Sequence, residues 1–148
     1  MDNNAINASI KLLEEKTSSK VLVYITNDFA PGTPFTSQVG SDVIPFFKEI
    51  LEKQGVVNKR ILIINTNGGA LNVAWPLVNL IREYTLKEFQ VIVPSKSLSV
   101  GTLIAIGADK IKMLKGAFLS PIDPTGTFPI QNGTNLQNKA CSVEDIMG

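Results

Sequence analysis

The chain has 148 residues, 44% of them hydrophobic, which is enough for one domain with a buried core. Its 14 basic residues nearly balance its 13 acidic ones, and a net charge of +1 predicts neither a nucleic-acid surface nor an anionic-membrane surface. Because the sequence has no histidine, it excludes a Ser-His-Asp triad, a Cys-His dyad and the usual histidine-based zinc sites within the chain. We therefore expect no metal site.

The compartment is predicted from cysteine usage and from the amino-terminal sequence. Cys141 is the only cysteine, so no internal disulfide can form and a reducing compartment, the cytoplasm, is predicted. Residues 1–7 are polar and lack a signal pattern, and no apolar run approaches the ~20 residues that a membrane helix needs. We expect membrane association only through partners.

The first part of the sequence alternates helical and strand patterns. Ala5–Lys16 has apolar residues at helical spacing, and Lys20–Thr26 is rich in β-branched residues, which is typical of a strand. Asn27–Gly40 contains prolines, glycines and hydroxyl residues and predicts a long loop of functional importance. The pair Ser41-Asp42 is a candidate cap for a helix that runs to about Lys53.

The middle of the sequence continues this alternation. Arg60–Asn65 is apolar without alternation, so we expect both of its faces to be covered, as in a parallel sheet. A glycine-rich turn, Asn65–Ala70, leads into a predicted helix over Leu71–Tyr84, and Phe89–Val93 is the third predicted strand. Trp75 is expected in the core or at a subunit contact. The pattern predicts an α/β fold with a mostly parallel sheet flanked by helices.

A second strand-to-helix turn, Ser97–Thr102, precedes the very apolar run Leu103–Ala108. Backbone N–H groups at a helix start have no partner inside the helix, and they favour negative charge. A serine placed there has donors nearby for an oxyanion, which suits acyl transfer. Ser99 is therefore a candidate nucleophile.

The carboxyl-terminal part of the sequence is less apolar. Lys110–Leu114 predicts an edge strand, Gly116–Ser120 a short fifth strand, and Gly126–Asn138 a polar loop. Ser142–Asp145 has the pattern of a helix start, but the sequence ends before a helix can follow. We therefore interpret residues 1–148 as a single domain and expect the polypeptide to continue beyond them.

Several motifs recur in this order in one superfamily. They are Asn65–Ala70, Ala74-Trp75, Leu77–Tyr84, Val91–Pro94, Ser99–Ala105, Gly107–Asp109 and Pro121–Pro124. Together they resemble the serine dehydrogenase proteinase family, which is similar to signal peptide peptidase A and belongs with the Clp protease/crotonase fold. The resemblance implies a serine peptidase that needs no cofactor, acts on a polypeptide substrate and assembles into a homo-oligomer.

The resemblance also implies roles for individual residues. Ser99 matches the nucleophile, and Gly69 and Val100 match the positions whose backbone N–H groups form the oxyanion hole. Glycine lets the backbone approach a substrate carbonyl with no side chain between them. Gly68 and Gly101 are the predicted substrate-binding positions.

The general base is left open by the sequence. In the Ser-Lys branch of the superfamily a lysine follows the serine by a few tens of residues, just ahead of a helix. Lys139 stands there, 139 − 99 = 40 positions after Ser99. Asp123 is a candidate for orienting the base or for shaping its turn, and Lys96 is a further candidate base. A free lysine has a pKa of about 10.4, so a Ser-Lys dyad requires a lysine that burial has dehydrated.

Other interpretations of the same residues remain. Ser97 and Leu98 depart from the superfamily pattern, which often has glycine two residues before the nucleophile. A serine at such a turn is commonly only a helix cap, and Gly68-Gly69 can be only a tight turn. A non-catalytic scaffold and a crotonase-like acyl-CoA enzyme, which would use the oxyanion hole without a nucleophile, are the alternative functions. The phosphate-binding patterns G-x-x-x-x-G-K-[ST] and G-x-G-x-x-G are absent, which argues against nucleotide binding.

Overall fold

The computed structural model describes residues 3–26, 38–122, 125–132 and 135–142, with side chains placed for residues 4–26 and 38–122. Its helices are α1 (Asn3–Thr17), α2 (Val43–Gln54), α3 (Ala74–Glu83) and α4 (Val100–Ile106), with a 3-10 turn, η1, at Leu71–Val73. Its strands are β1 (Lys20–Ile25), β2 (Val57–Asn65), β3 (Thr85–Val93), β4 (Lys96–Ser97), β5 (Lys110–Met113), β6 (Phe118–Leu119), β7 (Thr125–Asn132) and β8 (Asn135–Ser142).

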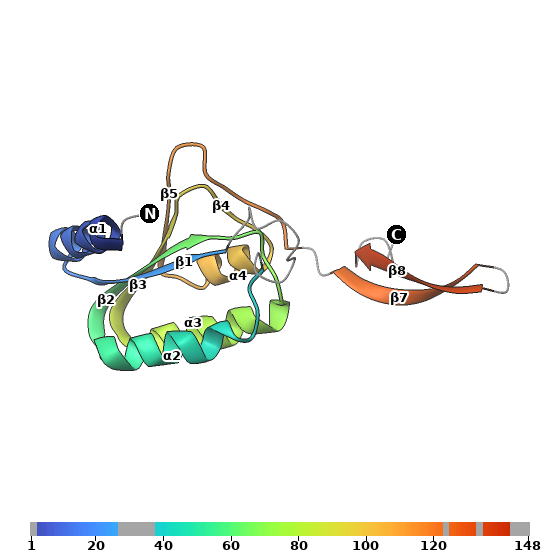
Figure 1. Cartoon of the computed structure of the whole chain (residues 1–148), viewed down its shortest axis with the longest axis horizontal. Helices are drawn as coiled ribbons and strands as arrows, with labels where there is room; N and C mark the ends of the chain where they lie inside the picture. The colour runs from blue at the N-terminus through green and yellow to red at the C-terminus, as the bar shows by residue number, and fades with distance from the viewer. Residues whose placement is uncertain (1–2, 27–37, 123–124, 133–134, 143–148) are drawn as a thin grey trace.

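The main sheet has four strands in the order β1-β2-β3-β5, and every neighbouring pair is parallel (Figure 1). This confirms the predicted α/β fold, with β5 as the expected edge strand. β4 and β6 form a second, small parallel sheet, which a bridge between Thr66 and Ser97 joins to the end of β2. Because the carboxyl ends of parallel strands meet at one edge, the turns after β2 and β3 come together.

One face of the main sheet carries the hydrophobic core. Leu22, Leu62 and Val91 on this face are buried and belong to the core cluster, to which α2, α3 and α4 also contribute. Figure 1 shows α2 and α3 side by side along the sheet. On the opposite face of β2, Ile61 is 1% exposed and Ile63 is partly buried, so both faces of this strand are covered as expected. Val23 on the neighbouring β1 is 42% exposed.

Two predicted helices differ in detail from the structure. The helix predicted over residues 71–84 begins as η1, and α3 proper starts at Ala74, which places Pro76 in its first turn, where a missing N–H is tolerated. Asp42 is the N-cap residue of α2, but its side chain makes no capping hydrogen bond. Its backbone is already helical (φ −61°, ψ −22°), whereas a capping side chain normally requires an extended backbone.

The prediction of a polar loop over residues 126–138 is wrong. β7 and β8 form an antiparallel hairpin there, with Gly126 opposite Cys141 and Asn132 opposite Asn135. Strand pairing satisfies backbone groups whatever the side-chain polarity. The two residues between the paired Asn132 and Asn135 are Gly133 and Thr134 in the sequence, and glycine at the first of two loop positions is a hairpin signal that was overlooked. The long loop expected over residues 27–40 lies largely outside the described residues, as does all of the predicted helix start at 142–145 except Ser142, which ends β8.

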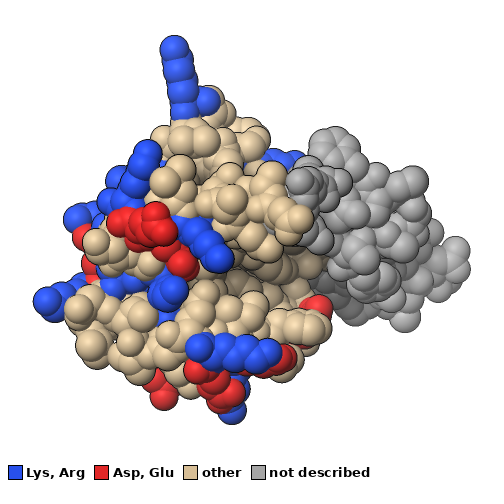
Figure 2. All heavy atoms as spheres, turned by 60° about the vertical axis from the view of Figure 1, so that its left-hand side comes forward, with Lys and Arg blue, Asp and Glu red and all other residues tan. Residues whose placement is uncertain are grey.

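Charges of both signs lie close together on the surface. Glu88 on β3 pairs with Lys59 on β2 (2.9 Å between Nζ and Oε1) and also with Lys110 on β5. Figure 2 shows basic and acidic side chains next to one another on the face that it presents. Within the described ranges, no helix is long and apolar enough to cross a bilayer.

Candidate active site

Ser99 occupies a strained turn between β4 and α4. It is the N-cap residue of α4, with φ 49° and ψ −113°, and Ser18 is the only other non-glycine residue with a positive φ in the described part of the chain. Such conformations cost of the order of 1–3 kcal/mol and persist only where surrounding contacts hold them. A strained strand-to-helix turn that presents a serine hydroxyl is the geometry of a nucleophile elbow.

The Ser99 side chain is accessible. The residue is partly exposed, and its hydroxyl makes no hydrogen bond with any residue that the structure describes. An alcohol enclosed in the core could not meet a substrate carbonyl, whereas Ser99 is a partly exposed residue. The placement meets the first structural requirement of a nucleophile.

Gly68 lies directly against the Ser99 turn. A Cβ atom built on Gly68 would lie 2.9 Å from the Leu98 carbonyl oxygen and 2.9 Å from Ser99 Cβ, and the φ of Gly68 is +102°. The Gly68 N–H donates to the hydroxyl of buried Thr66 (3.1 Å). Only glycine therefore allows the two turns to approach this closely.

Gly69 is held on one side by a segment that precedes α2. The Val39 N–H donates to the Gly68 carbonyl (2.7 Å), and the Ala70 N–H donates to the Val39 carbonyl (2.9 Å). This parallel bridge uses the neighbours of Gly69 and leaves the N–H of Gly69 itself without an acceptor among the described residues. The N–H of Val100, at the start of α4, is likewise without an acceptor in the described ranges. Neither N–H group is thus occupied by an acceptor in the described part of the chain, but Gly69 is partly exposed whereas Val100 is fully buried.

The two turns are joined through Thr66 and Gly101. The Thr66 N–H donates to the Lys96 carbonyl (3.1 Å), and the Leu98 N–H donates to the Thr66 carbonyl (3.0 Å). A Cβ on buried Gly101 would lie 2.5 Å from both Ser97 Oγ and Thr66 Cγ2. Glycine is therefore needed at 101 for interior packing, and its contact with substrate stays a prediction.

Two residues to which the sequence analysis gave no role support the serine turn. The Ser99 N–H donates to Ser120 Oγ (2.7 Å), and Ser120 Oγ donates to the Pro121 carbonyl (2.9 Å). The Thr102 hydroxyl lies 2.8 Å from the Ser97 carbonyl oxygen and 2.9 Å from the Ser120 carbonyl oxygen. No local pattern reveals Ser120, because 21 residues separate it from Ser99 and only the β4–β6 pairing brings them together.

The described part of the structure brings none of the candidate bases into contact with Ser99. Asp123 lies outside them, and for Lys139 only the backbone is described, in β8 opposite Phe128. Lys139 lies within β8, and the helix expected after it falls outside the described residues. Lys96 lies in β4, where its N–H donates to Asn65 Oδ1 (3.2 Å).

Asp109 fixes the far end of α4. Its carboxylate accepts from the Phe89 N–H (2.7 Å) and from Arg82 Nη2 (2.8 Å). These two hydrogen bonds, in that order, hold the pKa of the Asp109 carboxyl below its usual range. The helix that carries Ser99 at its start is thereby anchored at its end to both α3 and β3.

An apolar groove of about 330 Å³ lies between α3 and α4. It is lined by Leu71, Ala74, Trp75, Val78, Leu103, Ile106 and Gly107. Trp75 is 72% exposed, so the core placement considered for it is wrong. Two of its lining residues are close in sequence to the turns: Leu71 follows the glycine turn, and Leu103 follows the Ser99 turn.

The family assignment follows from comparison with known proteins. A family model described as ClpP-like SDH-type serine proteinase matches residues 53–142, more than half of the chain. The chain belongs to this family. The match to the ClpP-like SDH-type serine proteinases includes both turns and also Asp123 and Lys139, and it confirms the resemblance found in the sequence motifs.

Two curated relatives and one solved structure are also similar to this ClpP-like SDH-type chain. Two uncharacterized proteins from Methanocaldococcus jannaschii are 44% and 39% identical to it over 69 residues, 46% of the chain. The matched stretch covers 24% and 23% of those proteins, so the chain spans about a quarter of the length of the curated relatives it matches. A solved structure of a ClpP1 mutant from Listeria monocytogenes is similar with a TM-score of 0.44 and 17% identity, covering 74% of this chain and 57% of that one.

Proposed function

We propose that this member of the ClpP-like serine proteinases hydrolyses peptide bonds through an acyl-enzyme formed on Ser99. The observation that carries the proposal is the Ser99 turn, a partly exposed serine with φ 49° packed against Gly68 at the carboxyl end of the sheet. The backbone N–H of Gly69 beside it has no acceptor among the described residues. A serine that served only as a helix cap would need neither a positive φ nor glycine pressed against its Cβ.

The chemistry assigns a role to each turn. The Ser99 hydroxyl attacks the carbonyl carbon of the scissile peptide bond as a base takes its proton, and the amine leaves after the base returns that proton to it. The N–H groups of Gly69 and Val100 stabilise the oxyanion, each by about 100- to 1,000-fold in rate. Water then hydrolyses the ester on Ser99 and restores the free hydroxyl.

The base that we propose is Lys139, with Asp123 orienting it. A neutral lysine is required, because an ammonium group has no lone pair to accept a proton. Dehydration of the lysine over the Ser99 turn would supply that neutral form. The scheme uses side chains and backbone groups of the chain alone.

The second part of the proposal is that the protein acts on a polypeptide substrate and assembles into a homo-oligomer. Large apolar side chains are exposed on several elements, among them Trp75 (72%), Phe46 (61%) and Ile106 (56%). Burial of such side chains between copies would remove apolar surface from water. Light scattering on the purified protein gives the oligomeric state.

The proposed nucleophile is tested with a fluorescent fluorophosphonate, which phosphonylates an activated serine. We expect the wild-type protein to be labelled, Ser99→Ala to be unlabelled, and Ser95→Ala to be labelled like the wild type. Ser95 is a matched control because it is an exposed serine on the same connection between β3 and α4. A folded wild-type protein that resists labelling would instead favour the scaffold function, and saturable binding of an acyl-CoA would favour the crotonase-like one.

The proposed base is tested by Lys139→Arg, which retains the positive charge but removes a group able to lose its proton near neutral pH. We expect labelling to fall by about 100-fold or more, within the range of general-base catalysis. Lys115→Arg, at an exposed lysine on the β5–β6 connection, is the control and should leave labelling unchanged. Unchanged labelling in Lys139→Arg would exclude Lys139 as the base while leaving Ser99 as the nucleophile.

A further inference from the structure

The Ser99 turn depends on a hydroxyl from another part of the chain. The Ser99 N–H donates to Ser120 Oγ at 2.7 Å, and Ser120 follows directly after β6. We propose that Ser120 is a positioning residue, which holds the Ser99 backbone in its strained conformation and thereby aims the nucleophile. This inference rests on the proposed function, and it adds a residue to which neither the sequence motifs nor the family match gives a role.

The Ser120 hydroxyl is oriented for this contact. Its own proton is directed to the Pro121 carbonyl oxygen, 2.9 Å away, so a lone pair remains for the N–H of Ser99. A hydroxyl that is fixed as a donor to one group and an acceptor for another is a more defined partner than a freely rotating one. The hydrogen bond is therefore specific for the present orientation of the Ser99 peptide group.

The backbone that carries Ser120 is also fixed relative to the Ser99 turn. In the β4–β6 pair Ser97 lies opposite Leu119, so Ser120 emerges from β6 beside the chain that leads to Ser99. The Thr102 hydroxyl lies within hydrogen-bond distance of the carbonyl oxygens of both Ser97 (2.8 Å) and Ser120 (2.9 Å). The first turn of α4 thus links the strand before the nucleophile to the strand that supplies Ser120.

The contact has two consequences for chemistry. It opposes relaxation of Ser99 to a negative φ, which would relieve the strain and move Oγ away from its present position. It also occupies the N–H of Ser99, whereas the N–H groups of Gly69 and Val100 have no acceptor among the described residues. Because a nucleophile misplaced by about 1 Å can lose about 100-fold in rate, loss of this one hydrogen bond is expected to affect catalysis more than stability.

The test compares Ser120→Ala with Ser120→Thr, which restores a hydroxyl. Threonine suits the site because Ser120 precedes a proline, which favours the extended backbone that β-branched residues prefer. Fluorophosphonate labelling is followed over a range of probe concentrations, which separates the maximal rate from the half-saturating concentration. We expect Ser120→Ala to lower the maximal rate by about 10- to 100-fold with an unchanged half-saturating concentration, and Ser120→Thr to stay within about threefold of the wild type.

Amide hydrogen exchange supplies a readout that does not require activity. In the wild type the Ser99 amide should exchange slowly, because its N–H is hydrogen-bonded. In Ser120→Ala this amide should lose protection, while Leu103, whose N–H donates to the Ser99 carbonyl (3.2 Å), reports whether the turn of α4 stays intact. A rapidly exchanging Ser99 amide in the wild type would overturn the inference even if the alanine variant did not fold.

The inference and the proposed function fail in different ways. If the wild type is not labelled, the peptidase proposal is overturned, and with it the catalytic role of Ser120. If the wild type is labelled but Ser120→Ala reacts at the same maximal rate, only the role of Ser120 is overturned. A slowed Ser120→Ala that Ser120→Thr does not rescue would also overturn it, because the effect would then not depend on the hydroxyl.

Discussion

The two ends of the parallel sheet differ in how their hydrogen-bond donors are paired. At the carboxyl end lie the strained Ser99, the glycine turn and backbone N–H groups that have no acceptor in the described ranges. At the amino end Arg60 is fully buried, and its guanidinium donates to Gln54 Oε1, to the Gly55 carbonyl (2.9 Å) and to the Tyr84 carbonyl (3.4 Å). At the carboxyl end, backbone N–H groups thus lack acceptors among the described residues. At the amino end, the two terminal nitrogens of Arg60 cap the ends of α2 and α3, and its Nε has no partner in the described part of the chain.

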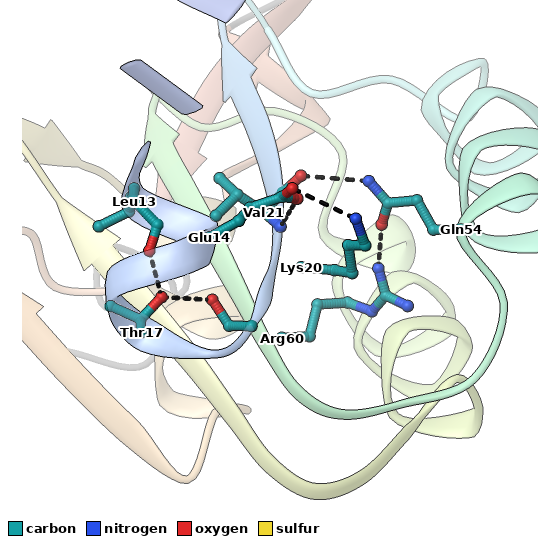
Figure 3. Close-up of polar contacts among 8 residues, drawn as sticks. Leu13, Glu14, Thr17, Lys20, Val21, Gln54 and Arg60 are labelled. Carbon is teal, nitrogen blue, oxygen red and sulfur yellow. Dashed lines mark hydrogen bonds and ion pairs between the residues drawn. The ribbon is translucent and has the colours of Figure 1, made fainter. Parts of the chain in front are cut away.

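Hydrogen bonds at the amino end of the sheet also hold α1 in place. Glu14 on α1 accepts from the N–H of Val21 (2.9 Å) and from Lys20 Nζ (3.3 Å), and Gln54 Nε2 donates to the Val21 carbonyl (3.3 Å), as Figure 3 shows. Burial lowers the pKa of the Arg60 guanidinium, partly offset by Glu14, but arginine stays charged at neutral pH. The comparison teaches that substitutions at this end should affect stability, and those at the other end activity.

The largest effect is expected for Arg60→Met at the amino end. The substitution leaves the carbonyl groups at the ends of α2 and α3 without their buried donor, so we expect a loss of about 3 kcal/mol in the free energy of unfolding. Urea denaturation measures this loss, with Lys87→Met at an exposed position of β3 as the control. Labelling of Ser99 per folded molecule should not change, and a selective loss of labelling would contradict the division between the two ends.

Gly68→Ala tests the carboxyl end with the next largest effect. A methyl group there would meet the Leu98 carbonyl and Ser99 Cβ, so the serine must shift, and labelling should fall by about 30-fold, or about 2 kcal/mol. Gly116→Ala is the matched control, because Gly116 also has a positive φ (+85°) but nothing lies within 4 Å of its added Cβ. If both variants were labelled like the wild type, close packing of the two turns would not matter for reactivity.

Ser99→Gly should raise stability. Glycine adopts φ 49° without the penalty of a side chain, so we expect a gain of about 1–2 kcal/mol in the free energy of unfolding, together with the loss of labelling. Ser99→Ala loses labelling but retains a Cβ, and its stability should stay near that of the wild type. Ser18→Gly removes another positive φ in a non-glycine residue (48°), next to α1, and this variant should be more stable than the wild type with unchanged labelling.

The smallest effect is a pH dependence at Asp109. Because its pKa is lower in the folded chain than in the unfolded one, the carboxylate contributes stability above its unfolded pKa, and this contribution is lost as the pH falls through its folded pKa. The side chain is 39% exposed, so solvent screening limits the contribution to less than about 1 kcal/mol. Thermal unfolding of Asp109→Asn between pH 7 and 3 should be less sensitive to acid than that of the wild type, and an equal sensitivity would contradict the prediction.

Much of the fold follows from local sequence patterns. The uninterrupted apolar runs that end at Asn65 and Val93 predicted two strands of a mostly parallel sheet, and β2 and β3 only extend further at their amino ends, to Val57 and Thr85. The hairpin β7–β8 was missed, because polar strands carry no hydrophobic alternation and depend on pairing with each other. The order of short motifs carried the resemblance to the serine dehydrogenase proteinase family, and the family match over residues 53–142 confirms it.

The sequence by itself determined which residues stand at the carboxyl ends of β2 and β3, because hydrophobic periodicity places the strands and leaves glycines and serines at their ends. Only the tertiary structure decided how those residues are held. The positive φ of Ser99, the hydroxyl of Ser120 at its N–H and the steric need for glycine at 68 and 101 all depend on contacts between segments distant in sequence. Such contacts form only when the sheet brings two strand ends together, and a local pattern holds no record of them.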